Sequence, residues 1–251
     1  MGIGPPPSES AADRAAETTD AQRQRICVLN EKSLHAALKE WYASPGTRVE
    51  VLLDGYIVDL LQDGRLVEIQ TRNFAALKQK VFALAQRHPV RLIYPVAQEK
   101  WIVKLASDGT ETVSRRKSPK RGRVEEVFGE LVSFPELLSK GNFSLEVLLI
   151  QEEEIRRFDG ARRWRRGGWV THERRLLGVT ACKVFETPAD AAALVPAPLA
   201  EPFTTSELAA AIGIRRNLAQ KMAYCLRKMG AIREEGRRRG GILYRRVGNA
   251  A

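Results

Sequence analysis

Val, Leu and Ile gather in three short runs between residues 48 and 71, and two Asp-Gly dipeptides separate the runs. Asp-Gly between apolar runs favours a two-residue type I′ hairpin turn, because both central residues of that turn need positive φ. Asp54-Gly55 and Asp63-Gly64 therefore predict a meander of three antiparallel strands, at about residues 48–53, 56–61 and 66–71.

Two-residue turns also set which side chains face each other. Leu61 then faces Leu66. By the same register Asp59 faces Glu68 and Glu50 faces Asp59, so three carboxylates form one row across the strands. Like charges directly opposite each other destabilise a sheet, whereas oxygen ligands suit Mg²⁺ or Mn²⁺. The row predicts a divalent-cation site; the alternative is a solvated acidic face whose pairs are off register.

Helical periodicity lies on both sides of this meander. Apolar residues three or four positions apart predict one helix from a cap at Asn30 to about residue 44, and another from a cap at Asn73 to about residue 88. Apolar runs predict further strands around 90–96 and 100–105. A helix between the third and fourth strands allows a parallel crossover, so we expect an α/β sheet with helices on its faces.

The αβββαβ order, with an acid on the second strand and Glu-x-Gln on the third, resembles the PD-(D/E)xK superfamily of restriction-endonuclease-like phosphodiesterases. The resemblance covers residues 30–105 and implies that Asp59 and Glu68 hold Mg²⁺ or Mn²⁺, with Glu31 as a further metal ligand. It also implies that Asp59, Glu68 and Gln70 are catalytic, and that Gln70 orients the attacking water. The alternative for Glu31 is an acid that simply favours the first turn of a helix.

Gln70 departs from the pattern of the superfamily, because most members have Lys at this position. A neutral amide lacks the positive charge that assists the attacking water. The departure leaves three interpretations open: a slow site, a site that has lost its activity, or one completed by another cation. The candidates for that cation are Lys78, Lys80 and Lys100.

The net charge of +11 indicates a polyanionic partner. Residues 107–188 form a basic linker followed by an arginine-rich region that contains strands and interleaves arginines with Phe158, Trp164 and Trp169. Arginines with aromatic residues can hold phosphates and stack on bases, so we assign part of this region to DNA. The alternative is an exposed basic hairpin with structural tryptophans. The arginines assigned to DNA are Arg162, Arg163, Arg165 and Arg166.

Residues 204–248 follow an Ala/Pro-rich linker at 189–203 and resemble a winged helix-turn-helix. Thr204 or Thr205 caps a short helix that ends at Gly213, a second helix has a buried apolar stripe, and a charged hairpin follows. The resemblance implies that the second helix enters a major groove of DNA and that the hairpin tip contacts phosphates, although such folds also mediate protein contacts. The residues assigned to DNA are Arg215, Arg216, Asn217, Gln220 and Lys221 of the helix and Arg237, Arg238 and Arg239 of the tip.

Together these features predict a metal-dependent DNA endonuclease with a disordered tail at 1–24, a nuclease-like domain at 25–106 and a winged helix. The alternative is a catalytically inactive DNA-binding regulator or a subunit of a DNA-processing complex. The three cysteines lie far apart, and no apolar run approaches the ~18 residues of a membrane span, so we expect a cytoplasmic protein without membrane contact. Cleavage of both DNA strands would need a homodimer or a partner subunit.

Overall fold

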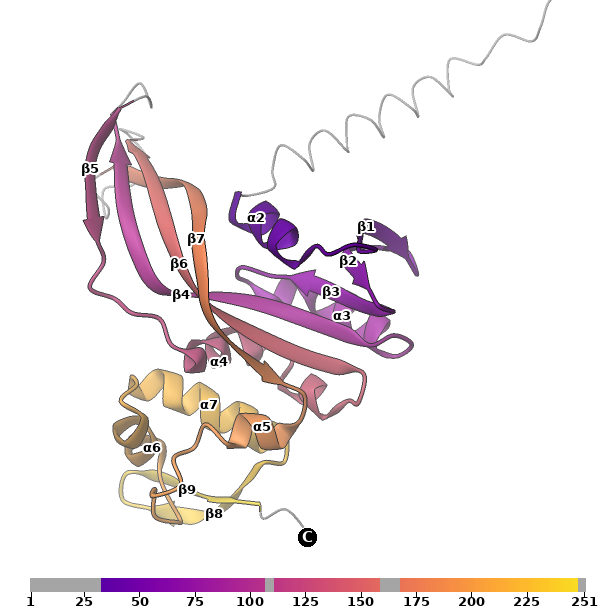
Figure 1. The fold of residues 1–251 in the computed structure, drawn as a ribbon. Coiled ribbons are helices and arrows are strands. Elements are labelled where there is room, and N and C mark those ends of the chain that lie inside the picture. Colours follow the sequence, from indigo (N-terminus) through magenta and orange to yellow (C-terminus); the bar gives the residue numbers. More distant parts are fainter. Residues whose placement is uncertain (1–32, 107–110, 159–167, 248–251) are drawn as a thin grey trace, which may run out of the picture.

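The computed structural model describes residues 33–106, 111–158 and 168–247 (Figure 1). The first elements follow the predicted order of helix, three strands, helix and strand, and the mixed α/β class is confirmed. They are α2 (Ser33–Tyr42), β1 (Arg48–Leu53), β2 (Tyr56–Gln62), β3 (Arg65–Ile69), η1 (Phe74–Leu77), α3 (Lys78–Ala85) and β4 (Val90–Leu105). Asn30, the predicted cap of the first helix, and the predicted tail at 1–24 lie outside the described residues.

The two Asp-Gly turns have the predicted geometry. All four residues of Asp54-Gly55 and Asp63-Gly64 have positive φ, between 49° and 80°. Leu61 pairs with Leu66 between β2 and β3, and Arg48 pairs with Leu61 between β1 and β2, so both predicted registers are confirmed. The other helix cap differs: Asn73 has φ 59° and its side chain makes no capping hydrogen bond.

The sheet continues well beyond the meander. Its strand order is β1-β2-β3-β4-β6-β7, with β5 (Thr112–Lys117) also paired to β4, and β4 runs parallel to both β3 and β6. The strands completing it are β6 (Phe143–Phe158) and β7 (Trp169–Phe185). The predicted strands at 90–96 and 100–105 are one strand of 16 residues, because β6 pairs along nearly all of β4 and holds its polar middle extended.

The outer parts of β4, β6 and β7 join β5 in an arm that projects away from the helices (Figure 1). Strands β4 and β5, which lie on either side of the predicted domain boundary at residue 106, are thus paired in one sheet. Short helices between β5 and β6 lead back from the arm, and the predicted break near Pro135 is the start of the last of them. They are η2 (Val124–Val127), α4 (Phe128–Leu131) and η3 (Pro135–Ser139).

Residues 188–247 form a C-terminal unit with two longer helices and a hairpin. Thr204 and Glu207 form a capping box at the start of the first of these helices, and Gly213, at φ 76°, ends it as predicted. The elements are α5 (Pro188–Ala192), α6 (Thr205–Ile212), α7 (Arg216–Lys228), β8 (Ile232–Arg238) and β9 (Gly241–Arg246). No helix in the described ranges is both long and apolar enough to cross a membrane.

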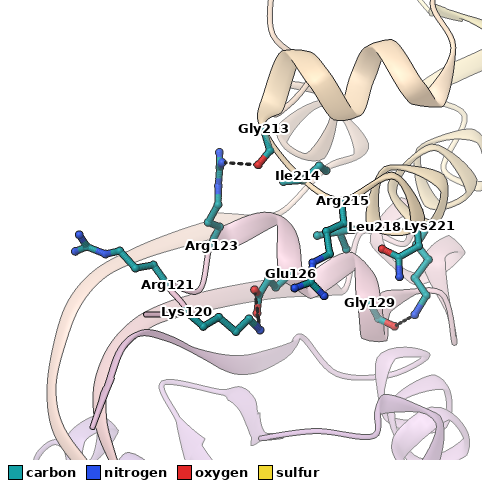
Figure 2. Close-up of a pocket in the computed structure, with 11 residues that line it drawn as sticks. Lys120, Arg121, Arg123, Glu126, Gly129, Gly213, Ile214, Arg215, Leu218 and Lys221 are labelled. Atoms are coloured by element: carbon teal, nitrogen blue, oxygen red, sulfur yellow. Dashed lines mark hydrogen bonds and ion pairs between the residues drawn. The ribbon is translucent and has the colours of Figure 1, made fainter. Parts of the chain in front are cut away.

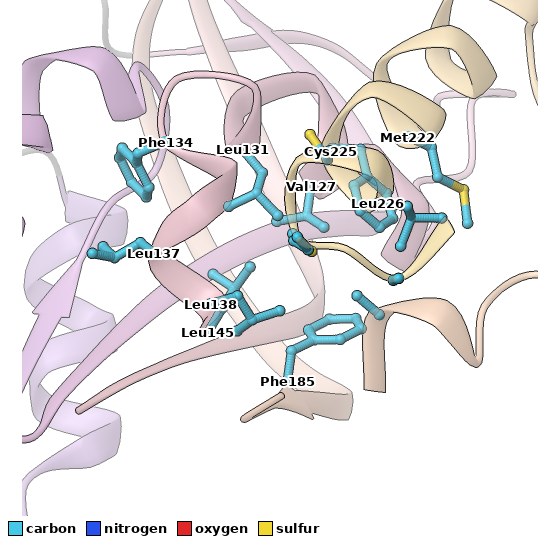
Figure 3. Close-up of a cluster of buried hydrophobic side chains, with 14 of the residues drawn as sticks. Val127, Leu131, Phe134, Leu137, Leu138, Leu145, Phe185, Met222, Cys225 and Leu226 are labelled. Atoms are coloured by element: carbon cyan, nitrogen blue, oxygen red, sulfur yellow. The ribbon is translucent and has the colours of Figure 1, made fainter. Parts of the chain in front are cut away.

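Polar and apolar contacts hold the C-terminal unit against the sheet domain, which comprises the elements from α2 to β7. Arg123 donates to the Ile212 carbonyl at 2.9 Å. Lys221 donates to the Gly129 carbonyl at 3.1 Å (Figure 2). Beneath them one hydrophobic core runs from one face of the sheet through α4 and η3 to α7 (Figure 3). Val195, in the predicted linker at 189–203, is only 4% exposed and belongs to this core. The predicted linker is therefore part of the core that joins the C-terminal unit to the sheet domain.

A second, smaller core lies on the opposite face of the sheet. Leu34 and Leu38 of α2 are fully buried there against strand residues such as Leu60 and Ile69. The sheet consequently has α2 on one face and α3, α4 and α7 on the other. The candidate acids on β2 and β3 lie between these two layers.

Candidate active site

Asp59 and Glu68 come together where β2 and β3 part. The paired residues of these strands end at Leu60 and Val67. Beyond that point, backbone N–H groups of each strand donate to side-chain carboxylates of the other strand and not to its backbone carbonyls. Asp59 Oδ2 accepts a hydrogen bond from the Ile69 backbone N–H at 2.8 Å, and Glu68 accepts one from the Asp59 backbone N–H at 3.4 Å. The two acids predicted to face each other are thus in direct contact through the backbone.

Strand β2 is irregular at Asp59. Val58 packs in the core beneath α3, whereas Leu60 packs in the core beneath α2, although residues two apart share a face of a regular strand. On the neighbouring strand, Glu50 has φ 52°, which turns it out of the usual alternation. Its half-exposed carboxylate accepts from Lys39 at 2.9 Å. The prediction that Glu50 completes a row of three carboxylates is therefore wrong.

A basic side chain from each flanking helix contacts the acid pair. His35 Nε2 of α2 lies 3.2 Å from Asp59 Oδ2. Lys80 Nζ of α3 lies 2.6 Å from Glu68 Oε1 and donates to the Ile57 carbonyl at 2.5 Å. Of the three lysines considered as substitutes, only Lys80 makes such a contact in the described part of the chain.

The other two lysines have different neighbours. Lys78 lies over the ring of Phe82 at 5.9 Å. Lys100 forms ion pairs of 2.9 Å with both Glu152 and Glu154, at the base of the arm. His35 was not among the predicted site residues. The available signal was its spacing of four from Glu31, because residues four apart share a helix face.

The acid pair has opposite pKa shifts. Burial, and then the nearby charge of Asp59, raise the pKa of Glu68 to about 7, with Lys80 acting in the other direction. Burial also acts to raise the pKa of Asp59. Hydrogen bonds from His35 and from the Ile69 N–H, with the charges of His35 and Lys80, outweigh burial and hold that pKa below its ordinary value. Two nearby carboxyl groups with separated pKa values are typical of catalytic and metal-binding sites.

The remaining predicted active-site residues are less well placed. The Gln70 side-chain amide donates to the Asn73 carbonyl at 3.1 Å, so it is held by its own turn. Glu31 lies outside the described residues, as do Arg162, Arg163, Arg165 and Arg166. In the structure, His35 and Lys80 therefore contact the acid pair, whereas Gln70 is bonded to the Asn73 carbonyl.

The residues assigned to DNA in the C-terminal unit are exposed, but they do not share one open surface. Arg215, Asn217 and Lys221 line a pocket that faces residues 120–129 of the sheet domain (Figure 2). Arg216 and Gln220 do not line it and are exposed on the same helix. At the tip of the β8–β9 hairpin, Arg238 forms an ion pair with Glu207, and its neighbours Arg237 and Arg239 are exposed.

Residues 32–186 match the family model described as Domain of unknown function (DUF8091), a range that extends from α2 to the end of β7. An uncharacterized protein of Treponema pallidum (strain Nichols) is 32% identical over 225 residues, covering 88% of this chain and 87% of the relative. The similarity covers 88% of the chain, whereas residues 1–186 make up less than three quarters of it. The similarity to this relative therefore extends into the C-terminal unit. No solved structure matches the chain. The protein belongs to the family of the domain of unknown function DUF8091.

Proposed function

We propose that this protein is a metal-dependent DNA endonuclease, with a restriction-endonuclease-like αβββαβ core and a C-terminal winged helix. The contact between Asp59 and Glu68 at the parting of β2 and β3 is the observation that carries the proposal. The parallel pairing of β3 with β4 supports the fold assignment, because it is the crossover that such a core needs. DNA is the proposed substrate because of the +11 net charge and the basic C-terminal unit.

The donor set fits a hard divalent cation. Asp59 and Glu68 offer carboxylate oxygens, and Mg²⁺ is commonly held by one or two carboxylates together with water and substrate phosphates. Glu68 is 2% exposed beside another carboxylate, so a cation would relieve its repulsion by Asp59. The described residues contain no cluster of three His, Cys, Asp or Glu with metal-binding geometry. When bound, the ion would lower the pKa of its water and neutralise charge on the scissile phosphate.

The protein side chains around the pair have separate proposed roles. Asp59 and Glu68 hold the cation, and His35 orients Asp59 through its 3.2 Å contact. Lys80 supplies the positive charge that Gln70 lacks, and its ammonium group stabilises the negative charge that develops on the phosphate in the transition state. Gln70, freed from the Asn73 carbonyl, would hydrogen-bond the attacking water.

One observation favours a second candidate, a DNA-binding subunit without catalytic activity. Both acids are satisfied inside the protein: Glu68 by Lys80, and Asp59 by His35 and the Ile69 N–H. Such an arrangement needs no metal ion to satisfy the acids, which fits a subunit that performs no chemistry. A DNA-binding subunit would be indifferent to Mg²⁺, whereas a nuclease site gains thermal stability on binding it.

Supercoiled plasmid incubated with the protein and Mg²⁺, Mn²⁺ or EDTA tests the proposal. The parent should nick the plasmid only with a divalent ion, while Asp59→Ala and Glu68→Ala should not cleave but should still retard the plasmid on a gel. Glu40→Ala is the matched control, since it removes an exposed carboxylate of α2 outside the site. Lys80→Ala should slow cleavage on the order of 100-fold with unchanged binding. Equal cleavage by the parent and Asp59→Ala would refute the assignment.

A further inference from the structure

A basic pocket lies where the C-terminal unit meets the sheet domain. It has a volume of about 390 Å³ and lies between the start of α7 and residues 120–129, which connect β5 to α4 (Figure 2). A single carboxylate, that of Glu126, is among its lining residues. Five cationic side chains line it: Lys120, Arg121, Arg123, Arg215 and Lys221.

Two of these cations fix the walls of the pocket. Arg123 bonds the Ile212 carbonyl, and Lys221 bonds the Gly129 carbonyl, so each ties one unit to the other. Lys120 pairs with Glu126 and Arg121 pairs with Glu99, both at 3.1 Å, but these lysine and arginine side chains are largely exposed and can move to a ligand.

Arg215 is the cation with no committed partner. It is exposed, lies at the N-terminal end of α7, and forms no ion pair with any of the described residues. Figure 2 shows it extending from α7 toward Glu126 and the segment opposite. The 13-residue helix also begins without a side-chain cap, so its positive end adds to the potential of the pocket. These charges favour an anion with several acceptor oxygens, which describes a phosphate group.

A second pocket shows where a longer ligand would continue. Lys120 and Glu126 line both pockets, so the two are adjacent. The second has a volume of about 320 Å³ and is also lined by Arg156, Arg174 and Thr71. Thr71 follows Glu68 by three residues, which span at most about 10 Å of chain. The shared lining residues therefore lead from the cations at α7 toward the segment that follows β3, the strand that carries Glu68.

We infer that the pocket between α7 and residues 120–129 binds backbone phosphates of a nucleic acid and directs that strand past Lys120 toward the end of β3. The choice of a nucleic acid rests on the proposed function, whereas the phosphate chemistry rests on the pocket alone. Arg215 then holds the backbone, and Lys221 stays in the wall of the pocket, so neither reads base edges in a major groove. Binding through these residues should accordingly be independent of DNA sequence.

Fluorescence anisotropy of a short labelled DNA duplex tests this inference, with every variant made in an Asp59→Ala background to prevent cleavage. Arg215→Ala should raise the Kd about tenfold, as expected for the loss of one charge-assisted hydrogen bond. The slope of log Kd against log salt should fall by about one. Arg215→Lys should recover most of the affinity. Arg48→Ala, which removes an exposed arginine of β1, should bind like the parent.

Two results would overturn the inference. The first is equal affinity and an equal salt slope for Arg215→Ala and the parent, provided that both have the same melting temperature. The second is stabilisation of the parent, but not of Arg215→Ala, by ATP or inorganic phosphate with no change in DNA affinity, which would assign the pocket to free phosphate compounds. Neither result affects the plasmid assay. Conversely, an uncleaved plasmid with weakened binding by Arg215→Ala would refute the endonuclease and support the pocket.

Discussion

Replacement of Glu68 by glutamine should make the metal-free protein more resistant to unfolding at alkaline pH. The Glu68 side chain is 3% exposed, and its carboxyl group lies beside Asp59 as well as Lys80. Its ionisation therefore places a second negative charge in a buried site. Glutamine has nearly the same shape and cannot ionise, so the substitution removes that charge with little change in packing.

The pKa of Glu68 gives the sign and size of the effect. Burial and the charge of Asp59 raise this pKa from 4.5 to about 7. A carboxyl group with a raised folded-state pKa stabilises the protein fully below its unfolded-state pKa, and this stabilisation is lost as the pH rises through the folded-state value. The shift of roughly 2.5 units corresponds to about 3 kcal/mol in the free energy of unfolding, lost between about pH 4.5 and pH 7.

Urea unfolding of the parent and of Glu68→Gln, with EDTA present and at several values between about pH 5 and pH 8, measures this difference. The difference in free energy of unfolding should move in favour of the variant by about 2 to 3 kcal/mol across that range. Other titrating groups cancel because they are common to both proteins. Parallel pH profiles would show that Glu68 titrates as an ordinary carboxyl group, and would refute its burial against Asp59.

Two further predictions concern the frame that holds the site. Lys100→Met should lower the free energy of unfolding at neutral pH by about 3 kcal/mol, because the fully buried Glu152 and its neighbour Glu154 lose the cation that they share. Guanidinium unfolding measures this loss, and an unchanged unfolding midpoint would contradict the prediction. Leu226→Ala, in the core between the units, should cost about 3 kcal/mol and lower the midpoints of tryptophan fluorescence and helical circular dichroism equally. Separate shifts of the two midpoints would show that the units unfold independently.

The meander and the acid pair were predictable because short-range chemistry determines them. Asp-Gly dipeptides select the turn type, the turn type sets the register, and the register brings Asp59 to Glu68. The same reasoning failed for Glu50, since a single residue with positive φ leaves the register intact while it redirects one side chain. Hydrophobic pattern alone contains no signal for that conformation.

The features that escaped prediction depend on contacts between distant parts of the chain. The polar sequence of β4 near Glu99 predicts a loop, but this part of the chain is a strand because β6 pairs with it. The alanines and prolines of residues 189–203 predict a linker, but Val195 is buried in a core that residues from both units form. Likewise, His35 belongs to no motif, and its contact with Asp59 depends on the packing of α2 over the strands.

Lys80 bears most directly on the choice between an active enzyme and a DNA-binding subunit. In a protein that has lost its chemistry, a lysine beside a nearly buried carboxylate has only a structural reason to remain, and an apolar replacement of both groups is often neutral or stabilising. Here Val81 and Leu84 anchor α3 in the core and thereby hold Lys80 against Glu68, while Gln70 occupies the position where the resemblance calls for lysine. The cation absent from β3 is supplied by the following helix. This arrangement retains a costly buried charge pair at the proposed site, and we therefore favour the active endonuclease.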